Sequence, residues 1–259
     1  MLGIAFAVLS AAGFGFNSAS MRRGVLSASS SQGLYYTVVL SLPLFFLAAL
    51  LTGQLFEYSE FSSRDILVLS IAGVVHIMVG RYFNIRAISA LGSNRAGPLV
   101  GTSTLVSVVV ALIFLQEELS WLKAFGILLM MIGPALIVRS TSKSKKVSAS
   151  EAPPVRPKEG YICAALAALA WGVGPVLMRS AMGDSGLGLL GGMTAYIAPS
   201  IILLLLLLLP GAFKRTMDVD PTARKWFLVS TGNSFGANVF RFMALSMAPV
   251  TIVIPLVRT

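Results

Sequence analysis

Long stretches without Asp, Glu, Lys or Arg divide the chain. These uncharged stretches are residues 1–21, 24–56, 96–116, 160–178 and 185–213. A helix that spans a bilayer needs about 20 predominantly apolar residues, and these stretches approach or exceed that length. The pattern therefore predicts an all-α integral membrane protein with several spans.

Charged and turn-forming residues set the limits of the expected spans. We expect spans at about 2–21, 34–52, 65–85, 96–115, 120–138, 160–179, 188–209 and 225–243, and a ninth from about 250 to Thr259. The segment 140–159 is rich in Ser, Lys and Pro and indicates a linker.

The two halves of the chain repeat each other at an offset of 157 residues. The first set of matching positions is Gly3, Ala7, Leu9, Ala11, Gly15, Met21 and Arg22 with Gly160, Ala164, Leu166, Ala168, Gly172, Met178 and Arg179. The second set is Phe83, Ala87, Ser89, Pro98, Leu99, Val100 and Thr102 with Phe240, Ala244, Ser246, Pro255, Leu256, Val257 and Thr259. Compositional similarity alone would not keep one offset through the loops.

Each repeat unit holds five expected spans, and an odd number makes the second unit enter the membrane from the opposite side. The sequence thus predicts an inverted repeat of two five-helix units: 1–139, the linker 140–159, and 160–259. A complete second unit would end near residue 296, about 37 residues further on, so we expect ten spans when complete and about eight and a half here.

Composition supports this class. Hydrophobic residues make up 56% of the chain, charged residues 12%, and the mean hydropathy is +0.85, whereas soluble domains carry about 25% charged residues. The single cysteine, Cys163, excludes a disulfide framework and a cysteine metal cluster. Most of the 20 Lys and Arg lie in short connectors, which is typical of membrane orientation signals and argues against nucleic-acid binding.

Ionisable side chains inside a span are costly, so they are candidates for function. No Asp or Glu falls within an expected span, which leaves no carboxylate there for proton coupling. Arg81 with Asn84, and Asn238 with Arg241, occupy equivalent repeat positions with the residue types exchanged. Each pair lies on one helical face, and inverted symmetry would bring both to a shared cavity.

Two interpretations of these arginines stay open. The arginines either form a cationic site for a carboxylate or phosphate, which Arg258 could join, or they extend to lipid headgroups. His76, with an ordinary pKa of about 6.5, either gates a proton or bonds to a neighbouring helix. Its repeat counterpart is Asn233.

Five further residues complete the set of candidates. Asn17 is the strongest polar group of the first span, and Trp171 either lines a cavity or packs between helices. Pro98, Pro175 and Pro255 are candidate helix breaks, acting as hinges or as packing kinks. Arg22 and Arg179 are interpreted first as interfacial anchors.

The order of these features resembles the repeat of EamA-type transporters in the drug/metabolite transporter superfamily. Residues 80–138 contain an aromatic followed by an Ala-Ile stretch, a small-residue run into Pro98, a long apolar helix, the pair Glu117–Glu118, and a helix with spaced glycines. The second unit begins with AALAALAWGVGPVLMRS, which is similar to the family's Trp-Gly opening. The resemblance implies ten spans around a central cavity and transport of small metabolites, amino acids among them.

We therefore expect a secondary transporter, an exporter of small polar metabolites by alternating access, in the plasma or inner membrane. The alternatives are a lipid-linked sugar or headgroup flippase of the same superfamily, or a truncated membrane partner protein. We expect no enzymatic activity, no cofactor and no metal. The expected partners are a small-molecule substrate, the lipid bilayer and a second copy in a homodimer.

Orientation has two opposing indications. The connectors on the side of the 139–159 linker carry 14 of the 20 Lys and Arg, which predicts a cytoplasmic linker and an external N-terminus. The resemblance implies both termini inside.

Overall fold

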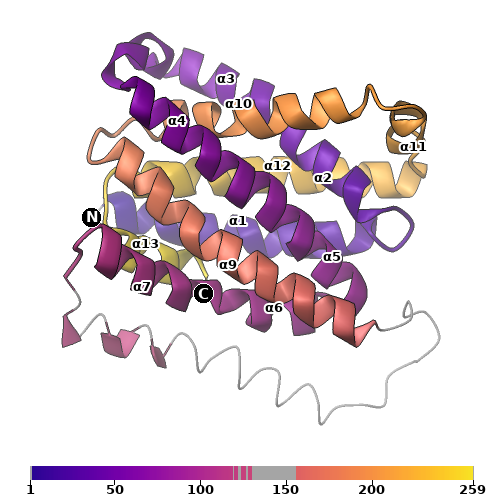
Figure 1. Ribbon diagram of the computed structural model, residues 1–259, viewed down its shortest axis with the longest axis horizontal. Coiled ribbons are helices and arrows are strands. Elements are labelled where there is room, and N and C mark those ends of the chain that lie inside the picture. The colour runs from indigo at the N-terminus through magenta and orange to yellow at the C-terminus, as the bar shows by residue number, and fades with distance from the viewer. Residues whose placement is uncertain (1, 119, 122–123, 127, 130–155, 259) are drawn as a thin grey trace.

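A computed structural model describes residues 2–118, 120–121, 124–126, 128–129 and 156–258, and these residues form a bundle of helices (Figure 1). The helices of the first half are α1 (Leu2–Gly24), α2 (Ser30–Val39), α3 (Ser41–Leu51), η1 (Gln54–Glu60), α4 (Ser63–Ala72), η2 (Gly73–Gly80), α5 (Arg81–Leu91), α6 (Ser93–Gly101) and α7 (Ser103–Phe114). Those of the second half are α9 (Pro157–Met182), α10 (Gly188–Leu206), α11 (Ala212–Met217), α12 (Pro221–Leu245) and α13 (Val250–Val257).

Within the described residues, six helical segments are long and apolar enough to cross a membrane, which confirms the predicted helical membrane protein. They are Leu2–Gly24, Ser30–Leu51, Ser63–Leu91, Arg95–Phe114, Pro157–Met182 and Gly188–Leu206. The 25-residue α12 covers the expected span 225–243 but is not among these six. Most of the expected span 120–138 lies outside the described residues, as does most of the expected linker.

Local signals explain where several helices begin. Ser29 and Ser62 each form a capping box, with Gln32 and Asp65 as the reciprocal partners. The Asp220 side chain accepts hydrogen bonds from the first backbone amides of α12. Proline tolerates the first turn of a helix, and α9 begins at Pro157, three residues before the predicted start of that span.

Two expected spans are interrupted. Pro43 lacks the amide that would bond to the carbonyl of Val39, and the helix breaks there between α2 and α3. The second break is at Thr102, between α6 and α7, where the Thr102 hydroxyl donates 2.6 Å to the carbonyl of Leu99.

The bundle is built around two helix crossings. α1 packs along α12, and α9 packs along the continuous rod formed by α4, η2 and α5. The α6–α7 segment and α13 also contact α9, while α10 lies against α3, α4 and α12. The core between these helices includes Tyr196, Phe45, Phe227 and Phe242, all fully buried.

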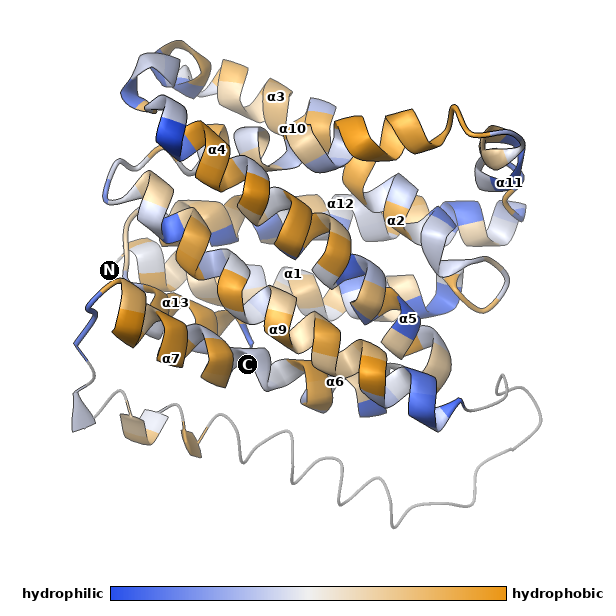
Figure 2. Ribbon diagram, viewed as in Figure 1, coloured by the Kyte–Doolittle hydropathy of each residue, from blue (hydrophilic) through white to orange (hydrophobic). Residues whose placement is uncertain are grey.

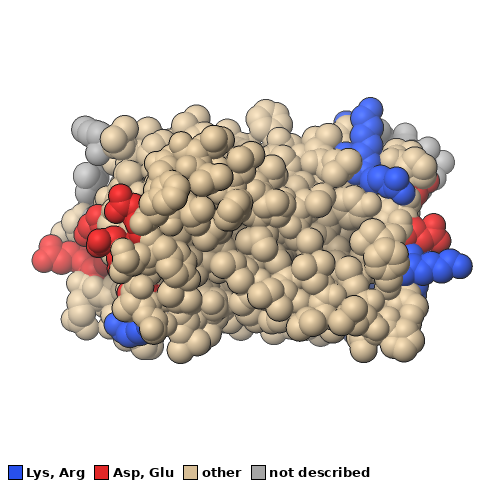
Figure 3. All heavy atoms as spheres, turned by 90° about the horizontal axis from the view of Figure 1, so that it is seen from above, with Lys and Arg blue, Asp and Glu red and all other residues tan. Residues whose placement is uncertain are grey.

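The surface has the polarity of a membrane protein. Hydrophilic residues concentrate near the two ends of the bundle (Figure 2), and the visible face between the ends carries no charged atoms (Figure 3). Large apolar side chains point outward, with Phe16, Leu51 and Phe114 at least two-thirds exposed. We call the end that holds the N-terminus, Glu57 and Asp184 the acidic end, and the end that holds Arg23 and Lys214 the basic end.

Candidate functional site

A buried cavity lies in the middle of the bundle, where both crossings meet α13. Its volume is about 10 Å³, room for about one water molecule. The residues that line it are Phe14, His76, Arg81, Trp171, Pro175, Arg241, Ile254, Val257 and Arg258. They come from α1, η2, α5, α9, α12 and α13, and thus from both halves of the chain.

An irregular helix holds His76 at this cavity. η2 is a π-helical segment of eight residues, a conformation that often marks functional sites. Trp171 Nε1 donates 2.9 Å to the carbonyl of His76, and the two rings stack with centroids 5.8 Å apart. A side chain at Gly174 would overlap His76, and one at Gly80 would overlap Trp171. Both glycines are therefore needed for this close approach.

Three arginines line the same cavity. Arg81 begins α5, Arg241 lies in α12, and Arg258 follows α13. Arg81 and Arg241 are only 7% and 3% exposed. The guanidinium of Arg258 lies 4.3 Å from the Trp171 ring centroid, and that of Arg241 lies between the rings of Phe14 and Phe242 at 5.7 and 5.3 Å. Aromatic faces thus hold two of the three charges.

Several polar atoms at the cavity have no hydrogen-bond partner. These buried atoms are Arg81 Nη1, Arg241 Nε and Nη2, and His76 Nδ1. Arg241 Nη1 contacts His76 Nε2. A guanidinium can only donate, so Nε2 is the acceptor and the ring proton resides on Nδ1. Within the described part of the chain, none of the three arginines has an ion-pair partner.

Five predicted side chains meet here: His76, Arg81, Trp171, Arg241 and Arg258, together with the predicted helix break at Pro175. The arginines lie in the interior and point to a shared cavity, instead of extending to headgroups. The assignment of substrate binding to these residues stays a prediction.

The predicted asparagines lie outside this lining. Asn17 accepts a hydrogen bond of 2.7 Å from Ser230, and Asn233 donates one of 3.3 Å to Ser20. Asn238 donates a hydrogen bond of 2.7 Å to the carbonyl of Ser234. Asn84 is half-buried in α5. A sequence shows that a buried residue is polar, but the neighbouring helix decides whether its hydrogen bonds are already used.

The two other predicted helix breaks lie within helices. Pro98 is inside α6 and Pro255 is inside α13, one residue from the cavity-lining Ile254. Their role as hinges stays a prediction.

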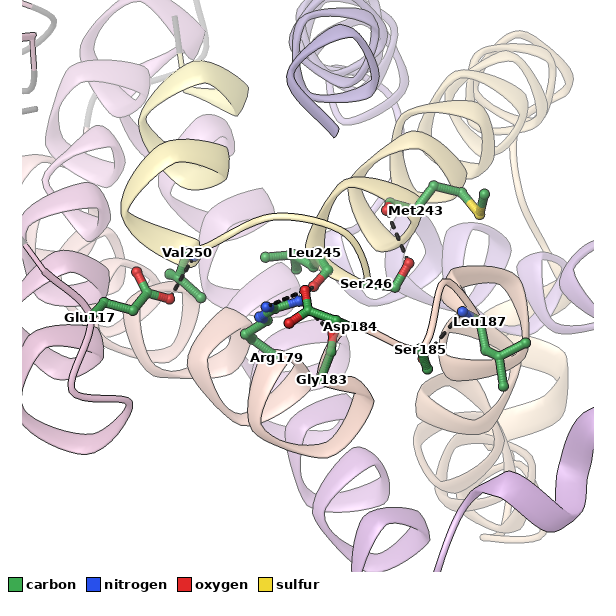
Figure 4. Close-up of polar contacts among 10 residues, drawn as sticks. All are labelled: Glu117, Arg179, Gly183, Asp184, Ser185, Leu187, Met243, Leu245, Ser246 and Val250. Atoms are coloured by element: carbon green, nitrogen blue, oxygen red, sulfur yellow. Dashed lines mark hydrogen bonds and ion pairs between the residues drawn. The ribbon is translucent and has the colours of Figure 1, made fainter. Parts of the chain in front are cut away.

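Arg22 and Arg179 are not only surface anchors. Arg22 Nη1 donates 3.1 Å to the carbonyl of Ile88, and Arg179 Nη1 donates 3.0 Å to that of Leu245. Arg179 also pairs with Asp184 at 2.7 Å (Figure 4). Each arginine thereby ties the end of the first long helix of its half to the end of the third.

Sequence reasoning missed four residues of interest. Phe14 lines the cavity at the repeat position of Trp171, a signal that could have identified it. Ile254 and Val257 are apolar and carry no such signal. Glu117 accepts 2.8 Å bonds from the amides of Val250 and Thr251, closing the acidic end onto the start of α13 (Figure 4).

The described residues contain no group of three or more His, Cys, Asp or Glu side chains that could hold a metal ion. The lining therefore offers cations, aromatic rings and apolar side chains to a ligand.

Comparison with known proteins agrees with this architecture. Eleven chains of known structure match. One of them, titled "Crystal structure of protein", shares 16% identity over 99% of this chain and 92% of that chain, with a TM-score of 0.53, which shows a shared fold alone. No curated protein matches the chain. Residues 1–139 match the EamA-like transporter family. This match covers more than half of the sequence, and the protein belongs to the EamA-like transporter family.

Proposed function

We propose that the protein is a secondary transporter that moves a small polar metabolite by alternating access, with the central cavity as its substrate site. The observation that carries the proposal is the cavity itself: it is buried, it lies between the two ends, and both halves of the chain supply its polar lining. Transporters place their sites in this way, at the interface of their repeats.

An inverted repeat is part of this proposal, and the order and direction of the helices favour it. At the offset of 157, α1 corresponds to α9, α2–α3 to α10, η1 to α11, α4–α5 to α12 and α6 to α13, with bounds that agree within a few residues. In Figure 1, α1 runs from the acidic end to the basic end, whereas α9 runs the opposite way.

Reciprocal hydrogen bonds between the halves also favour this symmetry. At the basic end, Gln32 donates to the carbonyls of Arg215 and Asp218, next to α11, at 2.8 and 2.9 Å. At the acidic end, the amides of Leu189 and Leu190 donate to Gln54, in η1, at 2.9 and 3.1 Å. Positions 32 and 189 are repeat equivalents, and each meets the short helix of the other half.

Each end has contacts that must separate for access. The Glu117 bonds to Val250 and Thr251 join the two halves at the acidic end. At the basic end, Arg86 and Arg156 both pair with Glu159, which joins α5 to α9. Alternate loss of these contacts would expose the cavity first to one side and then to the other. The excess of Lys and Arg favours a cytoplasmic basic end.

Counterflow from proteoliposomes tests the proposal. The full chain is reconstituted, loaded with a panel of unlabelled metabolites, and supplied outside with a trace of each labelled compound. We expect accumulation of at least one soluble metabolite above that in protein-free vesicles. Trp171→Ala, which removes one wall of the cavity, should lower it. Accumulation of none of the panel, or full activity of this variant, would overturn the proposal.

A further inference from the structure

We propose that the cavity binds a small oxyanion with two negative charges, either a dicarboxylate or a phosphate monoester, rather than a zwitterionic amino acid. The inference rests on the proposed function, because it names the substrate class of the same site. It follows from three properties of the lining: its charge, the kind of hydrogen-bonding atoms that it presents, and its size.

The charge of the lining is strongly positive. Arg81, Arg241 and Arg258 line the cavity, and none of the residues that line it is an Asp or Glu. A guanidinium stays protonated in proteins, and an uncompensated charge away from water is costly. Three such groups around one small cavity require counter-charge, and two negative charges would leave a single positive excess.

The unpartnered atoms of the lining are all donors. Arg81 Nη1, Arg241 Nε and Arg241 Nη2 can only donate, and Nδ1 of His76 carries the ring proton because Nε2 faces Arg241. The Trp171 indole is also a donor, already bonded to the carbonyl of His76. A carboxylate or phosphate offers acceptors alone and matches this arrangement.

An ammonium group would find no side-chain hydrogen-bond acceptor among the described lining residues. The other lining residues, Phe14, Pro175, Ile254 and Val257, have no side-chain acceptor. The one buried unpartnered acceptor of α12, Asn238 Oδ1, belongs to a residue outside the lining. An amino acid would place its positive group beside three arginines, which disfavours it.

The observed space is that of a closed cavity. About 10 Å³ admits little more than one water molecule, so a ligand enters only when the helices around it separate. The guanidinium of Arg258 rests on the Trp171 ring, and an anion drawn between Arg258 and the buried pair Arg81 and Arg241 would connect α13 to α5 and α12.

Binding is tested by thermal unfolding of the purified full chain in neutral detergent at low ionic strength. The probes are succinate, glycerol 3-phosphate, alanine and choline, each titrated at constant ionic strength. A ligand that binds the folded state raises the unfolding temperature with its concentration. We expect a saturable rise with succinate or glycerol 3-phosphate, and the more effective of the two identifies carboxylate or phosphate as the preferred group. A rise with alanine or choline alone would overturn the inference.

Matched variants separate a binding role from a structural one. Arg241→Gln should weaken the anion's affinity by about tenfold or more, because a charged hydrogen-bond donor is lost. It should also raise the unfolding temperature of the ligand-free protein, because a buried unpaired charge is removed. Arg224→Gln, at an exposed position of the same helix, should change neither.

A ligand-free protein that unfolds at a lower temperature in Arg241→Gln, with anion affinity unchanged, would show a purely structural arginine and overturn the inference. If Arg241→Gln does not fold, Arg81→Gln and Arg258→Gln provide the same two readouts. Counterflow distinguishes this failure from that of the proposed function. Accumulation of alanine without anion binding rejects the anion and keeps the transporter, whereas anion binding without counterflow of any compound keeps the site and rejects transport.

Discussion

The two helix crossings of the bundle, which the offset of 157 residues relates in the sequence, differ in the residues at one pair of positions. Where α1 crosses α12, Asn17 and Ser230 form a hydrogen bond of 2.7 Å. The equivalent positions where α9 crosses η2 are Gly174 and Gly73. There a Cβ on Gly174 would overlap His76, and a Cβ on Gly73 would overlap the carbonyl oxygen of Ala195.

The difference shows how one backbone arrangement serves two purposes. A polar pair joins the first crossing at these positions, where Gly13 also packs closely against Ala237, and Gly174 lets α9 approach closely enough to bury His76 in the second. Interhelical contacts of both kinds stabilise membrane bundles. Both crossings leave polar donors free at the cavity: His76 and Arg81 belong to the second, and Arg241 belongs to α12 of the first.

The largest effect is expected from filling the close approach of η2 to α10 at Gly73. Gly73→Ala would force a methyl group into the backbone of α10, which cannot move like a flexible side chain, and should destabilise the fold by about 3 kcal/mol. Unfolding in detergent measures it. Gly232→Ala, where no atom lies near the added group, should instead be neutral or stabilise by up to about 1 kcal/mol. Equal effects of the two would contradict the comparison.

A pair of glycines at equivalent repeat positions tests the packing of α9 and α1 more finely. Gly172 of α9 faces Val106, whereas Gly15 of α1, its counterpart, has open space. Gly172→Ala should destabilise by about 2 kcal/mol because Val106 must shift, and Gly15→Ala should not destabilise. Measured unfolding free energies of the two variants give the difference directly. A larger loss at Gly15 would reverse the assignment of the tight crossing.

Loss of the polar contact between α1 and α12 should lower the unfolding free energy less than the substitutions of Gly73 and Gly172 do. Asn17→Ala leaves the Ser230 hydroxyl without its acceptor and should cost about 1 kcal/mol, in the range found for interhelical hydrogen bonds in membranes. Counterflow activity should be kept, because Asn17 is outside the cavity lining. Ser18→Ala, which removes only a bond within α1, is the control. Loss of transport at unchanged stability would place Asn17 in the site after all.

The smallest effect is expected at the indole nitrogen. Trp171→Phe keeps a ring beside His76 and Arg258 but loses the hydrogen bond to the carbonyl of His76, at a cost of about 0.6 kcal/mol. Trp226→Phe keeps the ring beneath Arg23 and serves as the control. The loss of unfolding free energy, measured for both variants under one condition, should be larger for Trp171→Phe than for Trp226→Phe by that amount. Equal losses would show that the indole hydrogen bond contributes nothing.

Much of the fold was predictable because a bilayer imposes length and apolarity on every span. The interruption at Leu40 follows from Pro43, a signal that the sequence carries, whereas the one at Thr102 was not predicted, because it depends on a hydroxyl that a spanning helix also tolerates. The arginines could be predicted as site candidates, because a charged side chain within a membrane span is costly and is usually functional. The asparagines could not be sorted, because Asn17 and Asn233 find partners only across helices that are distant in sequence.

The winding of η2 explains why the cavity lacks the symmetry of the repeat. The offset of 157 is the same before and after it, at Gly3 with Gly160 and at Pro98 with Pro255. A π-helix bonds each residue to the fifth along, so it rotates less per residue than the 100° of an α-helix.

The residues of α12 that match η2, 230–237, are α-helical, so the two helices differ in winding just before Arg81 and Asn238. Arg81 faces the cavity while its counterpart Asn238 does not, and Arg241 does so while its counterpart Asn84 does not. A difference in helical winding, without insertion or deletion, thus accompanies the different residues that the two halves of the chain bring to one cavity.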